Sequence, residues 1–187
     1  MKLKFFAPML AILVAVTARG DIIGPQPQEI ATSPDCSKVA RVFGSPWDKN
    51  AKGNRIVICS YNKDTDSYLR SSGFVFGEFG APHHLFVTND GKRLVGVDIS
   101  LNAGRLRIYD SAGKLLKIWK ADELLSPEEL AAVAQTGARL LWYESGWIEN
   151  GRFILRGPSH FSREGALGYH YRIEVDLGSL ALEKRKS

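Results

Sequence analysis

The chain has 187 residues, of which 44% are hydrophobic and 24% are charged, close to the average for globular proteins. This composition excludes a disordered chain and a collagen-like fibre. The formal net charge of +5 falls to +3 without Lys2 and Lys4, an excess too small to indicate nucleic acid or another polyanion as partner.

Residues 1–18 have the pattern of a secretory signal peptide. Two lysines precede an apolar run of 12 residues that begins at Phe5, and cleavage is expected after Ala18, with Gly20 as the second choice. The run is shorter than the roughly 20 residues that a membrane span needs. The pattern therefore predicts a secreted or periplasmic protein with no stable membrane anchor after cleavage.

Residues 19–32 show no periodicity, so we expect an extended leader before a single β-rich domain at 33–187. The even number of cysteines in an exported protein predicts a disulfide between Cys36 and Cys59. If the flanking strands pair antiparallel, these two residues fall opposite or nearly opposite each other. A redox or metal-binding pair is the alternative, but it lacks Cys-x-x-Cys spacing.

Strand signals continue along most of this domain, and between them lie turns rich in residues that tolerate positive φ, such as Asn89-Asp90-Gly91. The predicted strands are Val39 to Phe43, Ile56 to Tyr61, Phe74 to Phe79, Leu85 to Thr88, Leu94 to Ile99, Leu106 to Tyr109, Leu115 to Trp119, Leu140 to Tyr143, Phe153 to Leu155, Tyr169 to Val175 and Leu180 to Glu183.

One segment is predicted to be helical. Ser126 at the N-cap, Pro127 at the first helical position and Glu129 at the third form a capping box, and Gly137 can end the helix. Its apolar face carries no reactive side chain, so we expect a connector between two sheet units rather than a lid.

The turns also align as a repeat. Asp35, Asp90 and Asn150 occupy equivalent turn positions, separated by 55 and 60 residues. In the second and third copies, a similar outer hairpin follows the inner one. Each copy is thus a turn, an inner hairpin and an outer hairpin, as in a four-stranded propeller blade. The expected blades span residues 33–80, 81–125 and 138–183.

This layout resembles an uncharacterised group of secreted bacterial β-propeller-like proteins, whose blades open with Ser-Pro-Asp-Gly or Asn-Asp-Gly turns. The resemblance rests on residues 88–92, 107–114 and 142–153 and covers about residues 33 to 183. It implies an all-β fold of three propeller-like antiparallel blades with one short connecting helix, and no activity. Closed propellers usually have 4–8 blades, so this one is either open or completed by another copy. Cys36 replaces the Gly of the group, which predicts a different first turn.

The histidines are the candidate metal ligands and general bases. His83 and His84 are adjacent before a strand and should point to opposite faces, while His160 lies in a long polar loop. His170 falls on the polar face of an alternating strand. A metal site built from His83 or His84 with His160 stays open as an alternative, although no metal-ligand spacing is present. We expect no metal and no cofactor.

The candidate binding residues are Trp147, Trp142 and Tyr143, because such rings stack on sugars or pack against proteins. Aromatic residues on strands usually pack in the core, which is the favoured interpretation for Trp142 and Trp119. Trp147 follows Gly146 and precedes a turn, so it is expected to be exposed.

The chain contains no nucleophile elbow, phosphate-binding loop or complete calcium loop. The sequence therefore predicts an exported, non-enzymatic binding or structural module with a protein or glycan as partner. The alternative is a metal-dependent hydrolase that uses the loop histidines. The hydrolase needs two of those histidines in one pocket, whereas the binding module needs an exposed aromatic patch that includes Trp147.

Overall fold

The computed structural model describes residues 30–43, 54–77, 79–99, 104–133, 135–136, 139–157 and 171–186. The predicted signal peptide at 1–18, most of the expected leader, Gly137, His160 and His170 lie outside these residues.

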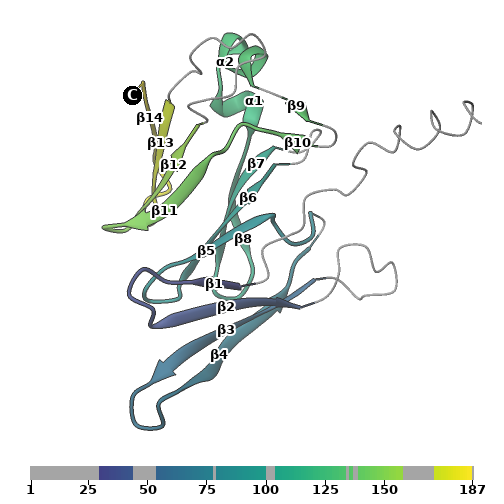
Figure 1. The fold of residues 1–187 in the computed structure, drawn as a ribbon. Coiled ribbons are helices and arrows are strands. Elements are labelled where there is room, and N and C mark those ends of the chain that lie inside the picture. The colour runs from purple at the N-terminus through teal and green to yellow at the C-terminus, as the bar shows by residue number, and fades with distance from the viewer. Residues whose placement is uncertain are drawn as a thin grey trace, which may run out of the picture.

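Three four-stranded antiparallel sheets make up most of the described chain (Figure 1). The strands of each sheet follow one another in chain order, so each sheet is a meander like a propeller blade. Blade 1 contains β1 (Ile30–Thr32), β2 (Lys38–Phe43), β3 (Arg55–Asn62) and β4 (Ser67–Val75). Blade 2 contains β5 (His84–Val87), β6 (Arg93–Asp98), β7 (Arg105–Asp110) and β8 (Leu115–Lys120). Blade 3 contains β11 (Ser145–Glu149), β12 (Arg152–Arg156), β13 (Tyr171–Asp176) and β14 (Leu182–Lys186).

The predicted fold class of three antiparallel blades is confirmed, and within the described residues the blades do not close into a ring. Two short strands, β9 (Gln135–Thr136) and β10 (Arg139–Leu140), form a separate ribbon in the chain segment that connects blade 2 to blade 3. The three terminal residues of the expected leader are β1, which pairs with β2.

The connection between blades 2 and 3 contains two helices rather than the single one predicted. These are α1 (Ala121–Leu124) and α2 (Pro127–Ala132). The predicted capping box is present in α2, where the Ser126 hydroxyl accepts the Glu129 N–H at 3.2 Å and the Glu129 carboxylate accepts the Ser126 N–H at 2.7 Å. The same carboxylate also pairs with Lys184 of β14 and so ties the helix to blade 3. In the described part of the chain, no helix is long and apolar enough to cross a membrane.

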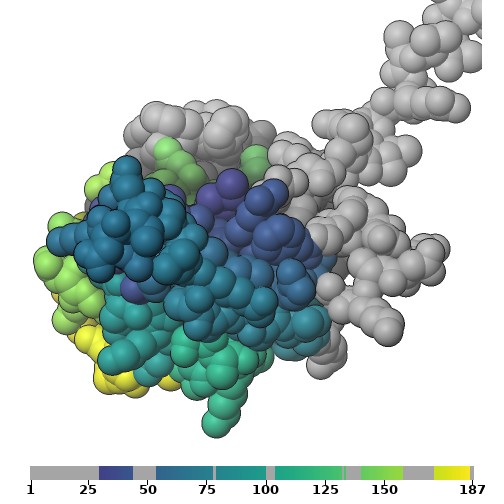
Figure 2. All heavy atoms as spheres, turned by 90° about the horizontal axis from the view of Figure 1, so that it is seen from below, coloured from purple at the N-terminus to yellow at the C-terminus, as the bar shows by residue number. Residues whose placement is uncertain are grey.

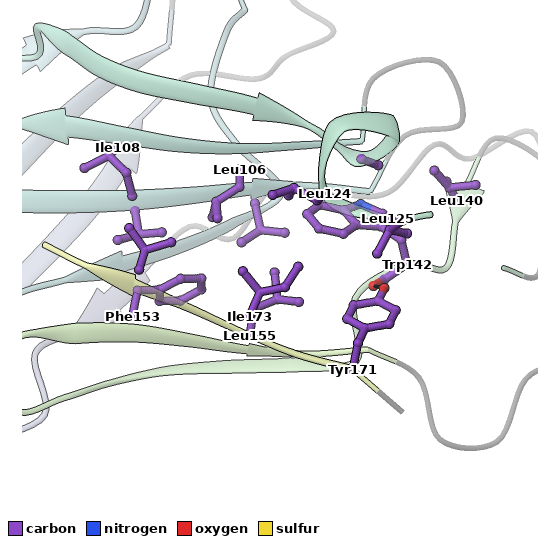
Figure 3. Packing of buried hydrophobic residues seen from close by; sticks show 14 of the residues in the cluster. Leu106, Ile108, Leu124, Leu125, Leu140, Trp142, Phe153, Leu155, Tyr171 and Ile173 are labelled. Carbon is purple, nitrogen blue, oxygen red and sulfur yellow. Dashed lines mark hydrogen bonds between the residues drawn. The ribbon is translucent and has the colours of Figure 1, made fainter. Parts of the chain in front are cut away.

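Blade 2 is packed on both faces. One face joins blade 3 in a core that includes Leu106 and Ile108 from β7 and Phe153 and Leu155 from β12 (Figure 3). The other face joins blade 1 in a second core, where Leu85 and Leu94 meet the buried side chains of β2 and β3. Because both faces of blade 2 carry apolar residues, its strands could be predicted from the sequence.

The turns that open blades 1 and 2 have the same hydrogen bonds. The hydroxyl of the first residue accepts the N–H five positions later, at 2.9 Å for Ser33 and 3.1 Å for Thr88. An Asp two positions into each turn accepts the N–H two positions further on, at 2.9 Å in both. Cys36 has a φ of 59° where Gly91 has 70°. The expectation of a different first turn is wrong, because Cys36 adopts the left-handed conformation that Gly would.

The predicted disulfide is also wrong, since Cys36 and Cys59 are both free thiols. The two flanking strands do pair antiparallel, but Phe43 lies opposite Arg55, and this register places Cys59 opposite Val39. Cys36 lies three residues before Val39, in the turn that precedes β2, and is therefore not a cross-strand neighbour of Cys59.

Candidate ligand-binding groove

The innermost strands of the three blades, β1, β5 and β11, are neighbours, with β5 in contact with both others. Each is followed by a turn that leads to the second strand of its blade, and these three turns meet on one side of the molecule. They border a groove of about 660 Å³, which we call the turn groove. Its lining residues are Pro34, Thr88, Asn89, Asp90, Lys92, Arg93, Ile148, Glu149, Asn150, Gly151, Leu177 and Gly178.

A second hollow of about 280 Å³ continues the turn groove along the inner strands. The two share Pro34 and Ile148, so their linings are continuous. Phe86 of β5 and Trp147 of β11 are among the residues that line this inner hollow. The turn groove therefore has a polar rim at the blade turns, and the inner hollow that continues it is more apolar.

Hydrogen bonds between blades hold the rim in place. The side-chain oxygen of Asn89 accepts the Asp35 N–H at 3.2 Å, and the backbone carbonyl of Asn89 accepts the Ser37 hydroxyl at 3.1 Å. These two hydrogen bonds join blades 1 and 2. The guanidinium of Arg93 donates to the Leu177 carbonyl at 3.1 Å, which joins blades 2 and 3. Because the rim is cross-linked in this way, its side chains are presented in a fixed geometry.

Charged groups of both signs stand at the rim. The Nζ atom of Lys92 lies 3.9 Å from Oδ2 of Asp90, and the Lys92 and Asp90 side chains are 75% and 55% exposed, respectively. Partial burial raises the pKa of Asp90, but hydrogen bonds from the Thr88 hydroxyl and the Lys92 N–H, together with the Lys92 charge, bring it below its usual range. The rim therefore offers a carboxylate acceptor and an exposed ammonium donor at neutral pH.

The three predicted binding residues lie in three different surroundings. Trp147 is half-buried, with the guanidinium groups of Arg156 and Arg172 at 5.1 Å and 5.8 Å from its ring centroid. Tyr143 is half-buried against the ring of His84 at 4.9 Å, and burial raises its pKa to about 12. Of the three, Trp147 is the one that lines either of the two hollows described above.

Trp142 is a core residue. Its side chain is fully buried, its indole N–H donates to the Asp98 carbonyl at 2.7 Å, and its own carbonyl accepts the Tyr171 hydroxyl. The proposal of Trp142 as a binding residue is therefore wrong, because its ring fills the space between blades 2 and 3 (Figure 3).

The two adjacent histidines contact different partners. The Nδ1 atom of His83 lies 3.3 Å from the buried Asp98 carboxylate, which also accepts the Arg107 guanidinium at 2.8 Å. His84 instead packs on Tyr143. Among the described residues, no group of three or more His, Cys, Asp or Glu side chains could hold a metal ion. His160, the third predicted member of the cluster, is not described.

Sequence reasoning used the residues of the turns as evidence for chain reversal and for a repeat, and so it did not identify Asn89, Lys92, Glu149 or Asn150 as a shared rim. The available signal was the alignment of the three turns, since equivalent turns of neighbouring blades fall on the same side of a propeller-like stack.

No protein-family model matches the chain, and no curated protein matches it. Solved structures that resemble it include the β-propeller domain of the Trilobed protease from Pyrococcus furiosus, described as having an open velcro topology, with 12% identity and a TM-score of 0.43 over 88% of this chain and 44% of that one. Sqt1 of Saccharomyces cerevisiae is 13% identical, with a TM-score of 0.43 over 86% of this chain and 34% of that one. An acylaminoacyl peptidase is 14% identical, with a TM-score of 0.44 over 88% of this chain and 25% of that one. The chain thus spans less than half the length of each of these chains.

Proposed function

We propose that the protein is an exported, non-enzymatic binding module that holds a short glycan in the turn groove. The observation that carries the proposal is the groove itself. Its volume of about 660 Å³ lies within the usual range of ligand sites, and its rim belongs to three blades that are joined by hydrogen bonds. The alternative occupant of the turn groove is a loop that a protein partner inserts.

The chemistry of the lining favours a sugar. Asn89, Asn150 and Lys92 supply hydrogen-bond donors, and Glu149 supplies acceptors, on the rim. Ile148 is an apolar residue of the same lining, and Trp147 is among the residues that line the adjoining hollow. A sugar ring has a polar edge of hydroxyl groups and an apolar face, so both parts of the lining find a counterpart.

Export and internal repetition belong to the same proposal. The signal pattern of residues 1–18 supports a secreted or periplasmic location. The identical hydrogen bonds of the turns at Ser33 and Thr88 support descent of blades 1 and 2 from one repeated unit.

The test is a glycan-array screen of the mature protein, followed by titration calorimetry with the glycan that binds best. We expect Lys92→Ala and Glu149→Ala each to weaken that binding about tenfold, as the loss of one charge-assisted hydrogen bond does. Lys114→Ala is the matched control, because Lys114 is exposed in another turn of blade 2 and does not line the groove.

The proposal is contradicted if no glycan binds, or if the two rim variants bind the selected glycan as tightly as the control does. Circular dichroism of each variant shows whether the fold is retained, so that a loss of binding is not confused with unfolding.

A further inference from the structure

The outer face of blade 1, which points away from blade 2, is apolar and exposed. The described chain has seven exposed large hydrophobic side chains, and five belong to this face. They are Ile30, Phe43, Tyr61, Tyr68 and Val75, with exposed fractions between 37% and 53%. A cluster of this kind on one sheet marks an interaction surface more often than isolated apolar residues do.

The strand register places these side chains on one face of the sheet, in two groups near opposite ends of the strands. Phe43, Arg55 and Val75 lie side by side across β2, β3 and β4, and Tyr61 lies opposite Tyr68 with ring centroids 5.4 Å apart. Their neighbours along the strands point the other way, into the core shared with blade 2. The purple-to-blue atoms of blade 1 form a continuous part of the surface in Figure 2.

The same face is positively charged. Arg41 and Arg55 place their guanidinium groups 4.7 Å and 5.6 Å from the ring centroid of Phe43, and Arg70 lies opposite Cys59. All three arginines are exposed, and none pairs with a carboxylate among the described residues. The four strands of blade 1 contain no Asp or Glu at all.

The outer face of blade 3, at the other end of the stack, is different because its charges are already paired. Glu174 is buried between Arg152 at 3.1 Å and Arg172 at 2.8 Å, and Arg185 pairs with Glu183 at 3.1 Å. Among the described residues, one end of the blade stack thus has arginines paired with carboxylates, and the other has arginines without such partners.

We propose that the outer face of blade 1 docks an acidic protein segment in which carboxylates alternate with aliphatic side chains. Covering this face removes three arginines from water, which is unfavourable unless the partner supplies carboxylates. Aliphatic side chains between those carboxylates would cover Phe43 and Val75. None of the exposed apolar residues or arginines of this face lines the turn groove, and the inference does not depend on the glycan.

A second copy of the chain lacks the required charge. Another blade 1 would bring three unpaired arginines against three, which is repulsive. The outer face of blade 3 would bring carboxylates that are already paired with its own arginines. Charge therefore selects a different, acidic protein over self-association.

The test uses the full mature chain and a dye-labelled peptide of alternating Glu and Val, followed by fluorescence anisotropy at low and physiological salt. We expect saturable binding that weakens with salt, and weaker binding of a peptide of alternating Glu and Ser, which has the same charge without the apolar groups. Arg41→Glu/Arg55→Glu should weaken Glu-Val binding about a hundredfold, because each of the two arginines makes a charge-assisted hydrogen bond that accounts for about tenfold in affinity.

The matched control is Lys114→Glu/Lys117→Glu, which changes the net charge equally on exposed residues of blade 2. It should bind the Glu-Val peptide within about twofold of the unaltered protein, as should Lys92→Ala in the turn groove. Phe43→Ser, which keeps all three arginines, should bind several times more weakly and so report the apolar part of the interface separately.

Three results would overturn the proposal. The first is no Glu-Val binding at either salt concentration, or equal losses of affinity in the arginine variant and the lysine control. The second is binding to phosphatidylglycerol-containing vesicles but not to the peptide, which would assign the face to a lipid surface. The third is a dimer in analytical ultracentrifugation that dissociates in the Phe43 variant, which would assign the face to a second copy.

Discussion

A buried hydroxyl group helps to connect blade 3 to the segment that leads into it. Tyr171 is buried, and its hydroxyl donates to the carbonyl of the equally buried Trp142. Burial, together with the charge of Glu129, raises the pKa of this phenol well above its usual range, so the donor keeps its proton at every pH at which the protein is handled.

Tyr171→Phe is therefore expected to lower the free energy of unfolding by about 1–3 kcal/mol, because it leaves a buried carbonyl without a donor. Urea unfolding measured by circular dichroism checks this. Tyr68→Phe is the matched control, since the Tyr68 hydroxyl donates to the Cys36 carbonyl at an exposed position and its removal should change stability by less than about 0.5 kcal/mol. Equal effects of the two variants would contradict the buried role of Tyr171.

Backbone conformation at Cys36 leads to a second prediction at the residue scale. A residue with a side chain is strained at a φ of 59°, so Cys36→Gly should stabilise the protein by up to about 1 kcal/mol. Gly91→Ala, at the equivalent position of blade 2, should destabilise it by a similar amount. Melting temperatures of the two variants should move in opposite directions, and a shift of both in the same direction would show that the turns are not equivalent.

At the scale of elements, the sequence identifies strands that are alternating or wholly apolar and misses those with neither pattern. The strands of blade 2 belong to the first kind, and their predicted positions agree with β5 to β8 within a residue or two. In β4, the first half mixes polar and apolar residues without alternation, so the sequence predicts only its last part from Phe74. The strand β11 was missed because it begins with Ser145-Gly146, which has low β-propensity.

Pairing register was harder to predict than strand position. The expected disulfide assumed that Cys36 and Cys59 lie opposite or nearly opposite each other, whereas the observed pairing of β2 with β3 places Val39 opposite Cys59. Because Ile56 to Ile58 of β3 are apolar without alternation, the sequence does not show which of them face the core, and the register could not be read from it.

The buried carboxylate of blade 3 gives a prediction with a pH dependence. Burial raises the pKa of Glu174, but the hydrogen bond from Arg152 and the charges of Arg185 and Arg172 outweigh burial and bring the pKa below its usual range. A group with a lowered pKa in the folded state contributes stability above its unfolded pKa of about 4.5 and loses it as the pH falls.

Glu174→Gln should therefore lower the free energy of unfolding by about 1–3 kcal/mol at pH 7 and have a smaller effect at about pH 3. Urea midpoints at the two pH values measure the difference. Glu183→Gln, at an exposed position on the same face, should have little effect at either pH. A Glu174 effect that is independent of pH would show that shape, and not charge, matters at this position.

At the scale of the molecule, blade 2 is the only described blade with a core on both faces, one shared with blade 1 and one with blade 3. Opening either neighbour leaves one core intact, but opening blade 2 disrupts both. We therefore expect the amides of β6 and β7 to exchange with deuterium most slowly, and those of the outer strands β4 and β14 most quickly. Faster exchange in β6 than in β14 would contradict this division.

The candidate site could be predicted from the sequence only in part. Turn residues such as Asn89 and Asn150 are recognisable, but they come from different blades far apart in the chain, and their meeting depends on how the blades stack. The sequence did separate Trp142, for which a core position was favoured and which is fully buried, from Trp147, which was expected to be exposed and is half-buried. The outer face of blade 1 was missed because its exposed apolar residues have the same pattern as buried ones.

The position of Trp142 also makes it an intrinsic optical reporter. Its indole lies in the dry contact between blades 2 and 3, whereas Trp147 is partly in contact with water. Emission from Trp142 should shift to longer wavelengths when these two blades separate, even while blade 1 stays folded. With Trp47, Trp119 and Trp147 replaced by Phe, the one remaining indole would follow the opening of that single joint in time.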